Sequence, residues 1–153
     1  MTDKYFLDTN IIIYSFDQSE IKKMRIAKKL IKNALKTHKG IISYQVLQEF
    51  INAALQKFKI PMEIEDCKSY TYNFLSPICE VFPSIELFHD AIDIKSEAKI
   101  GFYDALIVAS AVKGNARTLY TEDLNDGQKI RSVQIKNPFK KRQKEKLKLK
   151  ENH

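Results

Sequence analysis

Short apolar runs alternate along this chain with longer amphipathic segments, and this alternation constrains the fold more than any other sequence feature. The apolar runs predict five strands, the last of them weak, at 5–7, 41–42, 78–82, 118–121 and 133–135. The periodicity between them predicts helices at about 20–39, 44–58, 62–75, 84–99 and 103–112. Strands separated by helices predict an α/β fold in three layers, with a central parallel sheet of four to five strands flanked by helices.

Serine and glycine residues mark the expected ends of these helices. We expect Ser19, Ser43 and Ser84 to cap helix N-termini, because a serine hydroxyl accepts a hydrogen bond from a free backbone N–H of the first turn. We expect Gly40 and Gly101 to end helices, because glycine tolerates the left-handed backbone that commonly follows a last turn.

The length and the charge distribution predict one domain and a tail. A chain of 153 residues suits a single hydrophobic core. The net charge is +7, but residues 140–153 hold seven Lys or Arg and two Glu, so the rest is close to neutral. We therefore expect a folded domain over 1–138 and a flexible Lys-rich tail over 139–153. The alternative is an electrostatic arm that holds nucleic acid without sequence preference.

The composition argues against several other classes of protein. The longest apolar run, 105–112, is far shorter than the roughly 20 residues that span a bilayer, so we expect no membrane contact. Cys67 and Cys79 are too few for a disulfide framework or a zinc site. The charged first residues do not resemble a signal peptide. These features predict a cytoplasmic protein with reduced cysteines.

Two acidic residues lie where a parallel sheet places its ligands, beyond the carboxyl ends of the strands. Asp8 directly follows the first strand and lies between apolar runs. Asp104 is the only acid in the apolar segment 101–109 and lies in the first turn of a predicted helix. The alternative role for each is a turn or helix cap, since a helix N-terminus favours negative charge.

Two further positions extend this acidic set. Glu49 shares a helical face with Val46 and Ala53, which predicts that it lies on the buried side of its helix and is not fully exposed; the alternative is an exposed helix charge. The fourth strand is followed by an acidic loop that contains Glu122, Asp123 and Asp126. We expect one of these acids to lie at the same sheet end as Asp8, but the residues alone do not choose between Glu122 and Asp123. The alternative is an ordinary acidic surface loop.

Four carboxylates at one edge of a sheet do not stay ionised side by side without a cation. With oxygen ligands and no nearby His or Cys, the fitting metal is Mg²⁺ or Mn²⁺. Such a centre suits phosphodiester hydrolysis, because the metal lowers the pKa of a bound water and its charge stabilises the transition state.

Four segments in this order resemble the motifs of PIN domains, and most closely those of VapC-type toxins of prokaryotic toxin–antitoxin pairs. The resemblance covers about residues 4–137, and the segments are Phe6-Leu7-Asp8-Thr9-Asn10, Ser43-Tyr44-Gln45-Val46-Leu47-Gln48-Glu49-Phe50, Asp104-Ala105-Leu106-Ile107-Val108-Ala109 and Leu119-Tyr120-Thr121-Glu122-Asp123-Leu124. It implies a metal-dependent endoribonuclease that acts on RNA, is held inactive by a cognate antitoxin and forms a homodimer.

The resemblance also implies roles for individual residues. Asp8 and Asp104 match the two most direct metal ligands, and Glu49 and Asp123 match acids that act through water or a second metal. Asn10 matches the residue that orients the first aspartate. Thr121 resembles the hydroxyl residue beside the fourth acid, whereas Asp126 matches no fixed position and stays a secondary candidate.

Three other functions remain open at this point. The chain could be a non-catalytic PIN-like RNA-binding module, although its four acids argue against that. It could be a DNA-directed nuclease of the same superfamily, since the chemistry acts on the phosphate. A phospho-acceptor receiver domain, which needs paired acids near residue 10 and a lysine after the last strand, fits poorly, because the strand separates Asp3 from Asp8 and Glu49 lies in a helix.

Overall fold

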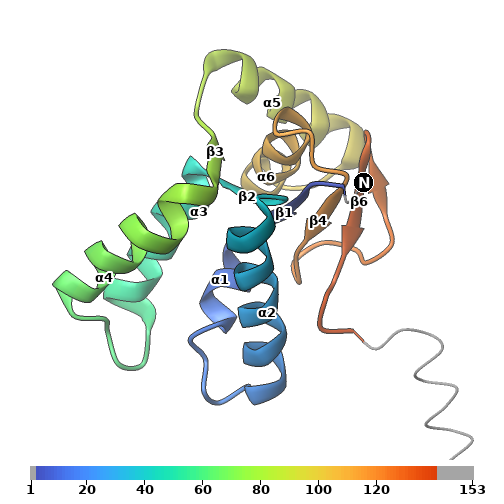
Figure 1. Cartoon of the computed structure of the whole chain (residues 1–153). Helices are drawn as coiled ribbons and strands as arrows, with labels where there is room; N and C mark the ends of the chain where they lie inside the picture. Colours follow the sequence, from blue (N-terminus) through green and yellow to red (C-terminus); the bar gives the residue numbers. More distant parts are fainter. Residues whose placement is uncertain (1–2, 141–153) are drawn as a thin grey trace, which may run out of the picture.

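The computed structural model describes residues 3–140, which form one six-stranded sheet with helices on both faces (Figure 1). The strand order is β3-β2-β1-β4-β6-β5, and all neighbours are parallel except β5 and β6. The strands are β1 (Tyr5–Leu7), β2 (Gly40–Ser43), β3 (Cys79–Val81), β4 (Thr118–Tyr120), β5 (Lys129–Ile130) and β6 (Val133–Lys136).

Six α-helices connect these strands. They are α1 (Thr9–Tyr14), α2 (Ile21–Thr37), α3 (Tyr44–Asn52), α4 (Ile64–Tyr70), α5 (Ile85–Ala98) and α6 (Phe102–Lys113). Short π-helical turns extend α3 over Ala53–Lys57 and α4 over Thr71–Leu75, and a 3₁₀ turn, Ser76–Ile78, leads into β3. The predicted α/β fold with a mainly parallel central sheet is confirmed.

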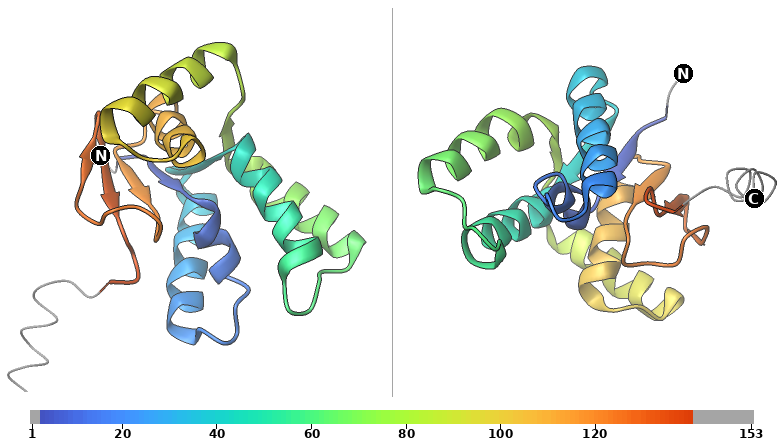
Figure 2. Two further views of the ribbon diagram at one scale, coloured as in Figure 1. Left: turned by 180° about the vertical axis from the view of Figure 1, so that it is seen from behind. Right: turned by 90° about the horizontal axis from the view of Figure 1, so that it is seen from below.

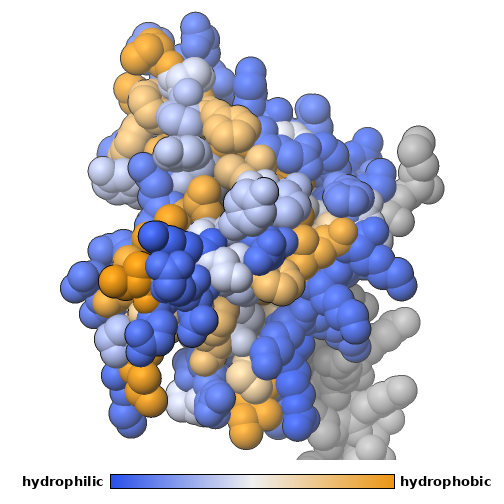
Figure 3. Space-filling model, turned by 60° about the vertical axis from the view of Figure 1, so that its left-hand side comes forward, coloured by the Kyte–Doolittle hydropathy of each residue, from blue (hydrophilic) through white to orange (hydrophobic). Residues whose placement is uncertain are grey.

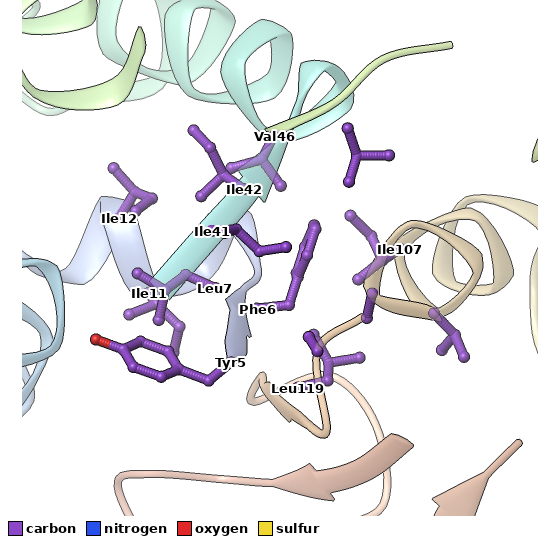
Figure 4. Packing of buried hydrophobic residues seen from close by; sticks show 14 of the residues in the cluster. Tyr5, Phe6, Leu7, Ile11, Ile12, Ile41, Ile42, Val46, Ile107 and Leu119 are labelled. Carbon is purple, nitrogen blue, oxygen red and sulfur yellow. The ribbon is translucent and has the colours of Figure 1, made fainter. Parts of the chain in front are cut away.

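The central strand β1 is buried on both faces, as expected for a parallel sheet covered by helices. All three of its residues are buried, and Phe6 lies opposite Ile41 of β2 and Leu119 of β4. Figure 4 shows Phe6 pointing toward Ile107 of α6, with Ile11 of α1 on the other side of the strand. The core therefore lies on both sides of β1 and fixes the position at which this strand ends.

The chain reverses its direction across the sheet between β1 and β4. It first moves from β1 outward to β2 and β3, and then returns past β1 to β4. Right-handed crossovers consequently place α1 to α4 on one face and α5 and α6 on the other (Figures 1 and 2). In open sheets of this type, the ligand crevice lies where the strand order reverses, beyond the carboxyl ends of the two strands concerned.

One strand was not predicted from the sequence. The pair β5–β6 is an antiparallel hairpin in which Ile130 lies opposite Val133. The strand β5 has two residues, which is too short to display any periodicity. The sheet therefore has six strands instead of the expected four to five.

The helix ends agree only in part with the expected capping residues. The hydroxyls of Ser43 and Ser84 accept hydrogen bonds from the third residues of α3 and α5, which confirms both caps. The prediction for Ser19 is wrong, because α2 begins after Glu20 without a side-chain cap and the Ser19 hydroxyl donates to Asp17.

Both predicted C-terminal glycines are also wrong. The helices α2 and α5 end at His38 and Lys99, two non-glycine residues with φ of 58° and 55°. Gly40 begins β2, where a Cβ atom would lie 2.6 Å from the Tyr5 ring. Gly101 precedes α6 as its N-cap.

The body of the domain extends slightly beyond the predicted boundary at 138. Phe139 packs edge-on against Tyr14, with ring centroids 5.0 Å apart. The rest of the Lys-rich tail, 141–153, lies outside the described residues. Among the described helices, none is both long enough and apolar enough to cross a membrane.

Candidate active site

Asp8 lies at the carboxyl end of β1 and is the N-cap of α1. Its Oδ1 atom accepts a hydrogen bond of 2.7 Å from the backbone N–H of Thr9, and the residue is only 5% exposed. The cap predicted as an alternative role is therefore real. It uses one carboxylate oxygen and leaves Oδ2 directed toward other partners.

A hydrogen-bond network joins the ends of β1 and β4 at the reversal of strand order. The hydroxyl of Thr121, a fully buried residue, donates to Asp8 Oδ2 at 2.8 Å. The same hydroxyl oxygen accepts from the backbone N–H of Asp123 at 3.0 Å. Asn10 Nδ2 donates to Asp123 Oδ2 at 3.0 Å and makes longer contacts with Thr121 at 3.3 Å and Asp8 at 3.5 Å. Asn10 and Thr121 thus orient two acids together.

The surroundings of Asp8 disfavour its charged form. Burial is the main cause, and the charges of Asp123 and Glu49 add to it, so the pKa of Asp8 rises to about 7 although Thr121 and Thr9 donate hydrogen bonds to its carboxylate. A buried carboxylate whose pKa is raised in this way would be stabilised in its charged form by a nearby cation.

Glu49 lies on the exposed edge of α3, and the prediction that it faces the buried side is wrong. The buried face of this helix runs through Val46 and Phe50, which places Glu49 beside it instead of within it. Its carboxylate nevertheless points back to the site, because Glu49 Oε1 accepts a 2.8 Å hydrogen bond from the Thr9 hydroxyl.

Asp104 lies in the first turn of α6 and is half-buried. Burial raises the pKa of its carboxyl group, and the negative charge of Asp123 raises it further. Asp104 therefore lies close enough to Asp123 for the two charges to interact across the reversal point.

The two adjacent acids after β4 have different partners. Glu122 accepts hydrogen bonds of 2.6 Å from both Lys23 Nζ and the Tyr14 hydroxyl. Burial raises the pKa of Glu122, but the hydrogen bonds from Lys23 and Tyr14 outweigh it, so the net pKa falls below its usual value. Glu122 is therefore already neutralised, while Asp123 is directed toward Asn10 and Asp8.

Asp126 lies away from these acids. Its Oδ1 atom accepts a 2.8 Å hydrogen bond from the backbone N–H of Asn137, so it ties the loop after β4 to the segment after β6. This role is structural, and no described contact joins Asp126 to the other acids.

The acids surround one end of the sheet without forming a closed ligand cage. Within residues 3–140, no group of three or more Asp, Glu, His or Cys side chains is close enough together to hold a metal ion. The donors nevertheless fit a hard divalent cation, because all are carboxylate oxygens and because Asp8 is destabilised in its charged form.

Sequence reasoning missed three residues that shape this site. Thr9 links Glu49 to the Asp8 turn, and Lys23 and Tyr14 neutralise Glu122. Thr9 lies inside the Asp8-Thr9-Asn10 segment, so its proximity was available in the sequence. Nothing local indicates that Lys23 pairs with a residue 99 positions away.

A comparison with family models and known proteins gives a consistent result. The model described as "PIN domain" matches residues 5–129. That range includes β1 to β4 and the acids Asp8, Glu49, Asp104 and Asp123. No curated protein matches significantly.

Several solved structures share the fold. A toxin–antitoxin complex from Klebsiella pneumoniae aligns with a TM-score of 0.63 and 22% identity, covering 88% of this chain and 98% of its own. VapBC2 from Rickettsia felis, bound to a DNA fragment from its promoter, aligns with a TM-score of 0.56 and 26% identity, covering 86% and 96%. DNA-bound VapBC from Salmonella typhimurium gives 0.59 and 23%, covering 88% and 98%.

Proposed function

Because the chain belongs to the PIN domain family, we propose that it is a Mg²⁺- or Mn²⁺-dependent endoribonuclease that hydrolyses RNA phosphodiester bonds. The observation that carries this proposal is the buried Asp8 carboxylate at the reversal of strand order. It shares Asn10 with Asp123 and lies near Glu49, while Asp104 lies near Asp123. Such carboxylates bind a divalent cation rather than a substrate phosphate, which they would repel.

The residues have separate parts in this proposal. Asp8 and Asp104 hold the metal, while Glu49 and Asp123 act on it through water or a second ion. Thr121 and Asn10 orient Asp8 and Asp123 through the hydrogen bonds described above. When bound, the metal supplies a water of lowered pKa and positive charge next to the reacting phosphate.

The direct test is cleavage of RNA by the purified full chain. We expect cleavage of total RNA in Mg²⁺ or Mn²⁺ and none in EDTA. Single-stranded DNA under the same conditions tests the DNA-directed alternative. Equal cleavage in EDTA would exclude the metal-dependent mechanism. Binding of RNA without cleavage in any metal would instead favour the non-catalytic module.

We further propose that the chain is the cytoplasmic toxin of a toxin–antitoxin pair. The structural neighbours are toxin–antitoxin complexes, and the chain has an apolar groove of about 390 Å³ between α2 and the α4 segment. Phe16, Leu35 and Tyr70 line it, and Phe74 is 45% exposed beside it. Apolar side chains also reach the surface elsewhere on the face shown in Figure 3. An apolar segment of the antitoxin would cover this groove.

Expression in a bacterial host tests the toxin proposal. We expect the wild-type chain to slow growth and the Asp8→Asn variant not to. A short open reading frame next to the gene should encode a protein that restores growth and co-purifies with the chain. If the wild-type chain is harmless yet cleaves RNA in vitro, the toxin role is wrong while the nuclease proposal stands.

A homodimer is the remaining partner proposal. A second groove, of about 460 Å³, lies between α3, α5 and α6. Tyr44, Phe82 and Tyr103 border it and are 41%, 60% and 69% exposed. We propose that a second copy covers these side chains, and light scattering on the wild type and on Phe82→Glu measures whether a dimer exists and dissociates.

We propose that the nuclease domain includes Phe139, one residue past the predicted boundary, since Phe139 packs on Tyr14. A chain truncated after Lys140 should keep its thermal stability and its metal-dependent cleavage at low salt. If residues 141–153 hold RNA, the truncated chain should show a shallower dependence of RNA affinity on salt, and identical slopes would exclude a role in binding.

A further inference from the structure

The helix α2 carries the densest positive charge in the described structure. Its 17 residues, Ile21–Thr37, include no acid. They include seven cations, namely Lys22, Lys23, Arg25, Lys28, Lys29, Lys32 and Lys36. The helix α5, on the other face of the sheet, has the opposite composition, with four acids and one lysine. The near-neutral charge of the body therefore hides two surfaces of opposite sign.

Five of these cations form one line along the exposed side of the helix, which we call the cationic stripe. Its residues follow the spacing of a single helical face, and all are exposed: Lys22, Arg25, Lys29, Lys32 and Lys36. From Lys22 to Lys36 the stripe spans about 21 Å of helix axis, at about 1.5 Å per residue. The buried residues Ala27, Ile31 and Ala34 lie on the opposite side and hold the helix to the body.

No partner within residues 3–140 compensates this charge. The only ion pair that a cation of α2 makes with a described residue is Lys23–Glu122, and Lys23 is not part of the stripe. Like charges three or four residues apart on a helix destabilise it by about 0.2–0.5 kcal/mol per pair. Successive cations of the stripe thus lie three or four residues apart without an ion pair to a described acid, at a cost to the isolated chain.

The stripe begins beside the candidate active site. Lys22 precedes Lys23, whose Nζ lies 2.6 Å from Glu122 Oε2, and Glu122 is adjacent to Asp123. Figure 1 shows α2 at the surface in front of α1, the helix that Asp8 caps. A strand of nucleic acid that leaves the acids past Glu122 would therefore reach the N-terminal end of α2.

We propose that the cationic stripe binds the phosphate backbone of the RNA substrate next to the cleavage site. This inference rests on the proposed nuclease function and adds a binding surface to it. The stripe would neutralise successive phosphates without reading bases, so it contributes affinity and not sequence specificity. The acids of the site repel the phosphates of RNA, and the stripe provides positive charge that attracts them.

The composition of the stripe favours RNA over an acidic protein partner. No apolar residue lies between its cations, whereas the core of a protein interface is depleted in charge and enriched in aromatic residues. Lys28 lies at the edge of the groove that we assign to the antitoxin, and so does Lys32, at the margin of the stripe. Arg25, Lys29 and Lys36 do not line that groove, which makes them the residues to test.

The experiment measures RNA affinity against salt for the full chain in EDTA, so that no cleavage occurs. The probe is a single-stranded 30-nucleotide poly-U, and the test variant is Arg25→Gln/Lys29→Gln/Lys36→Gln. A matched control, Lys57→Gln/Lys59→Gln/Lys113→Gln, removes the same charge from exposed positions elsewhere. If each cation of the stripe faces one phosphate, the slope of log affinity against log salt should become shallower by about 2 in the test variant. Affinity at about 0.1 M salt should fall about 100-fold.

Each outcome decides the inference. The control should keep the wild-type slope, and all variants should keep the wild-type melting temperature to within a few degrees. Equal slopes for the test and control variants would overturn the proposal. If the test variant loses binding to poly-glutamate as strongly as it loses binding to poly-U, the proposal also fails, because the stripe would then bind an acidic protein partner. Cleavage by the wild type in Mg²⁺ is measured separately. A slope change in the test variant without any cleavage by the wild type would refute the nuclease function and support RNA binding by the stripe. Cleavage by the wild type without a slope change would support the nuclease function and refute RNA binding by the stripe.

Discussion

The two halves of the candidate site differ in how firmly their acids are held. At the strand ends, Asp8 and Asp123 share Asn10 and Thr121. Six hydrogen bonds of 2.7 to 3.5 Å join these four residues and Thr9. On the helices, Glu49 has one side-chain hydrogen bond and Asp104 has none among the described contacts. The strand half is preorganised, and the helix half is not.

This difference has a physical origin. Asp8 and Thr121 follow strands fixed on both sides by hydrogen-bonded neighbours, so their positions are set by the sheet. Glu49 and Asp104 project from a helix edge and a helix first turn, where fewer hydrogen bonds hold their side chains. We infer that a metal would bind first to the strand half and draw the helix acids toward it, which fits the absence of a closed cage within residues 3–140.

Removal of one charge from each half should give the largest effect. We expect Asp8→Asn and Asp104→Asn each to lower RNA cleavage by about 10²–10³-fold, because a direct metal ligand contributes several kcal/mol to stabilising the transition-state charge. Cleavage rates at saturating Mg²⁺ measure this. A variant Asp104→Asn with wild-type activity would exclude the helix half from the metal site, whereas Asp126→Asn is the matched control and should remain active.

The same two variants should differ in stability without metal. The pKa of Asp8 is raised to about 7 in the folded state, above the value of 3.8 in the unfolded chain, so the native state loses stability as pH rises from about 3.8 to about 7. Asn removes this penalty but forms a poorer contact with Thr121. We expect Asp8→Asn to gain about 2 kcal/mol at pH 8 in EDTA, or about 4–8 °C, and less at pH 5.5.

Thermal melts at the two pH values test this directly. Asp104 is only half-buried, so Asp104→Asn should change the melting temperature much less at either pH. An equal gain in both variants would show that the two halves experience the same electrostatic penalty, and the comparison between them would then fail.

Loss of the orienting hydroxyl should have an intermediate effect. Thr121→Val keeps the shape of a fully buried side chain but removes the donor to Asp8 and the acceptor for the Asp123 N–H. We expect metal affinity to fall about 10–100-fold. Direct binding of Mn²⁺ and the dependence of the cleavage rate on Mg²⁺ concentration measure this. Thr121→Ser, which restores the hydroxyl, should recover most of it. If serine does not recover the affinity, the threonine contributes through packing alone.

Much of this arrangement was predictable from the sequence, and the limits have physical causes. The position of Asp8 follows from an apolar run that ends at it, and that of Asp104 from an apolar run that begins after it, since burial patterns determine where strands and helices begin and end. The exposure of Glu49 was mispredicted because it lies at the edge of a buried face, where a small rotation of the helix decides the outcome. The αL ends at His38 and Lys99 carry no glycine to indicate them.

The pairing of Lys23 with Glu122 shows the other limit, because it joins residues brought together only by the complete fold. We expect Lys23→Met to have the smallest effect, raising Mg²⁺ affinity about threefold, since an exposed ion pair contributes about 0.2–1 kcal/mol. The reason for any effect is that Lys23 holds Glu122 away from the site, so its loss frees a second carboxylate beside Asp123. The control is Lys4→Met, which breaks the Lys4–Glu80 pair, a pair of similar exposure at the other end of β1. Lys23→Arg keeps the positive charge and should retain wild-type Mn²⁺ binding. If Lys4→Met and Lys23→Met change Mn²⁺ affinity equally, the pairing of Lys23 with Glu122 serves stability alone and does not affect the metal site.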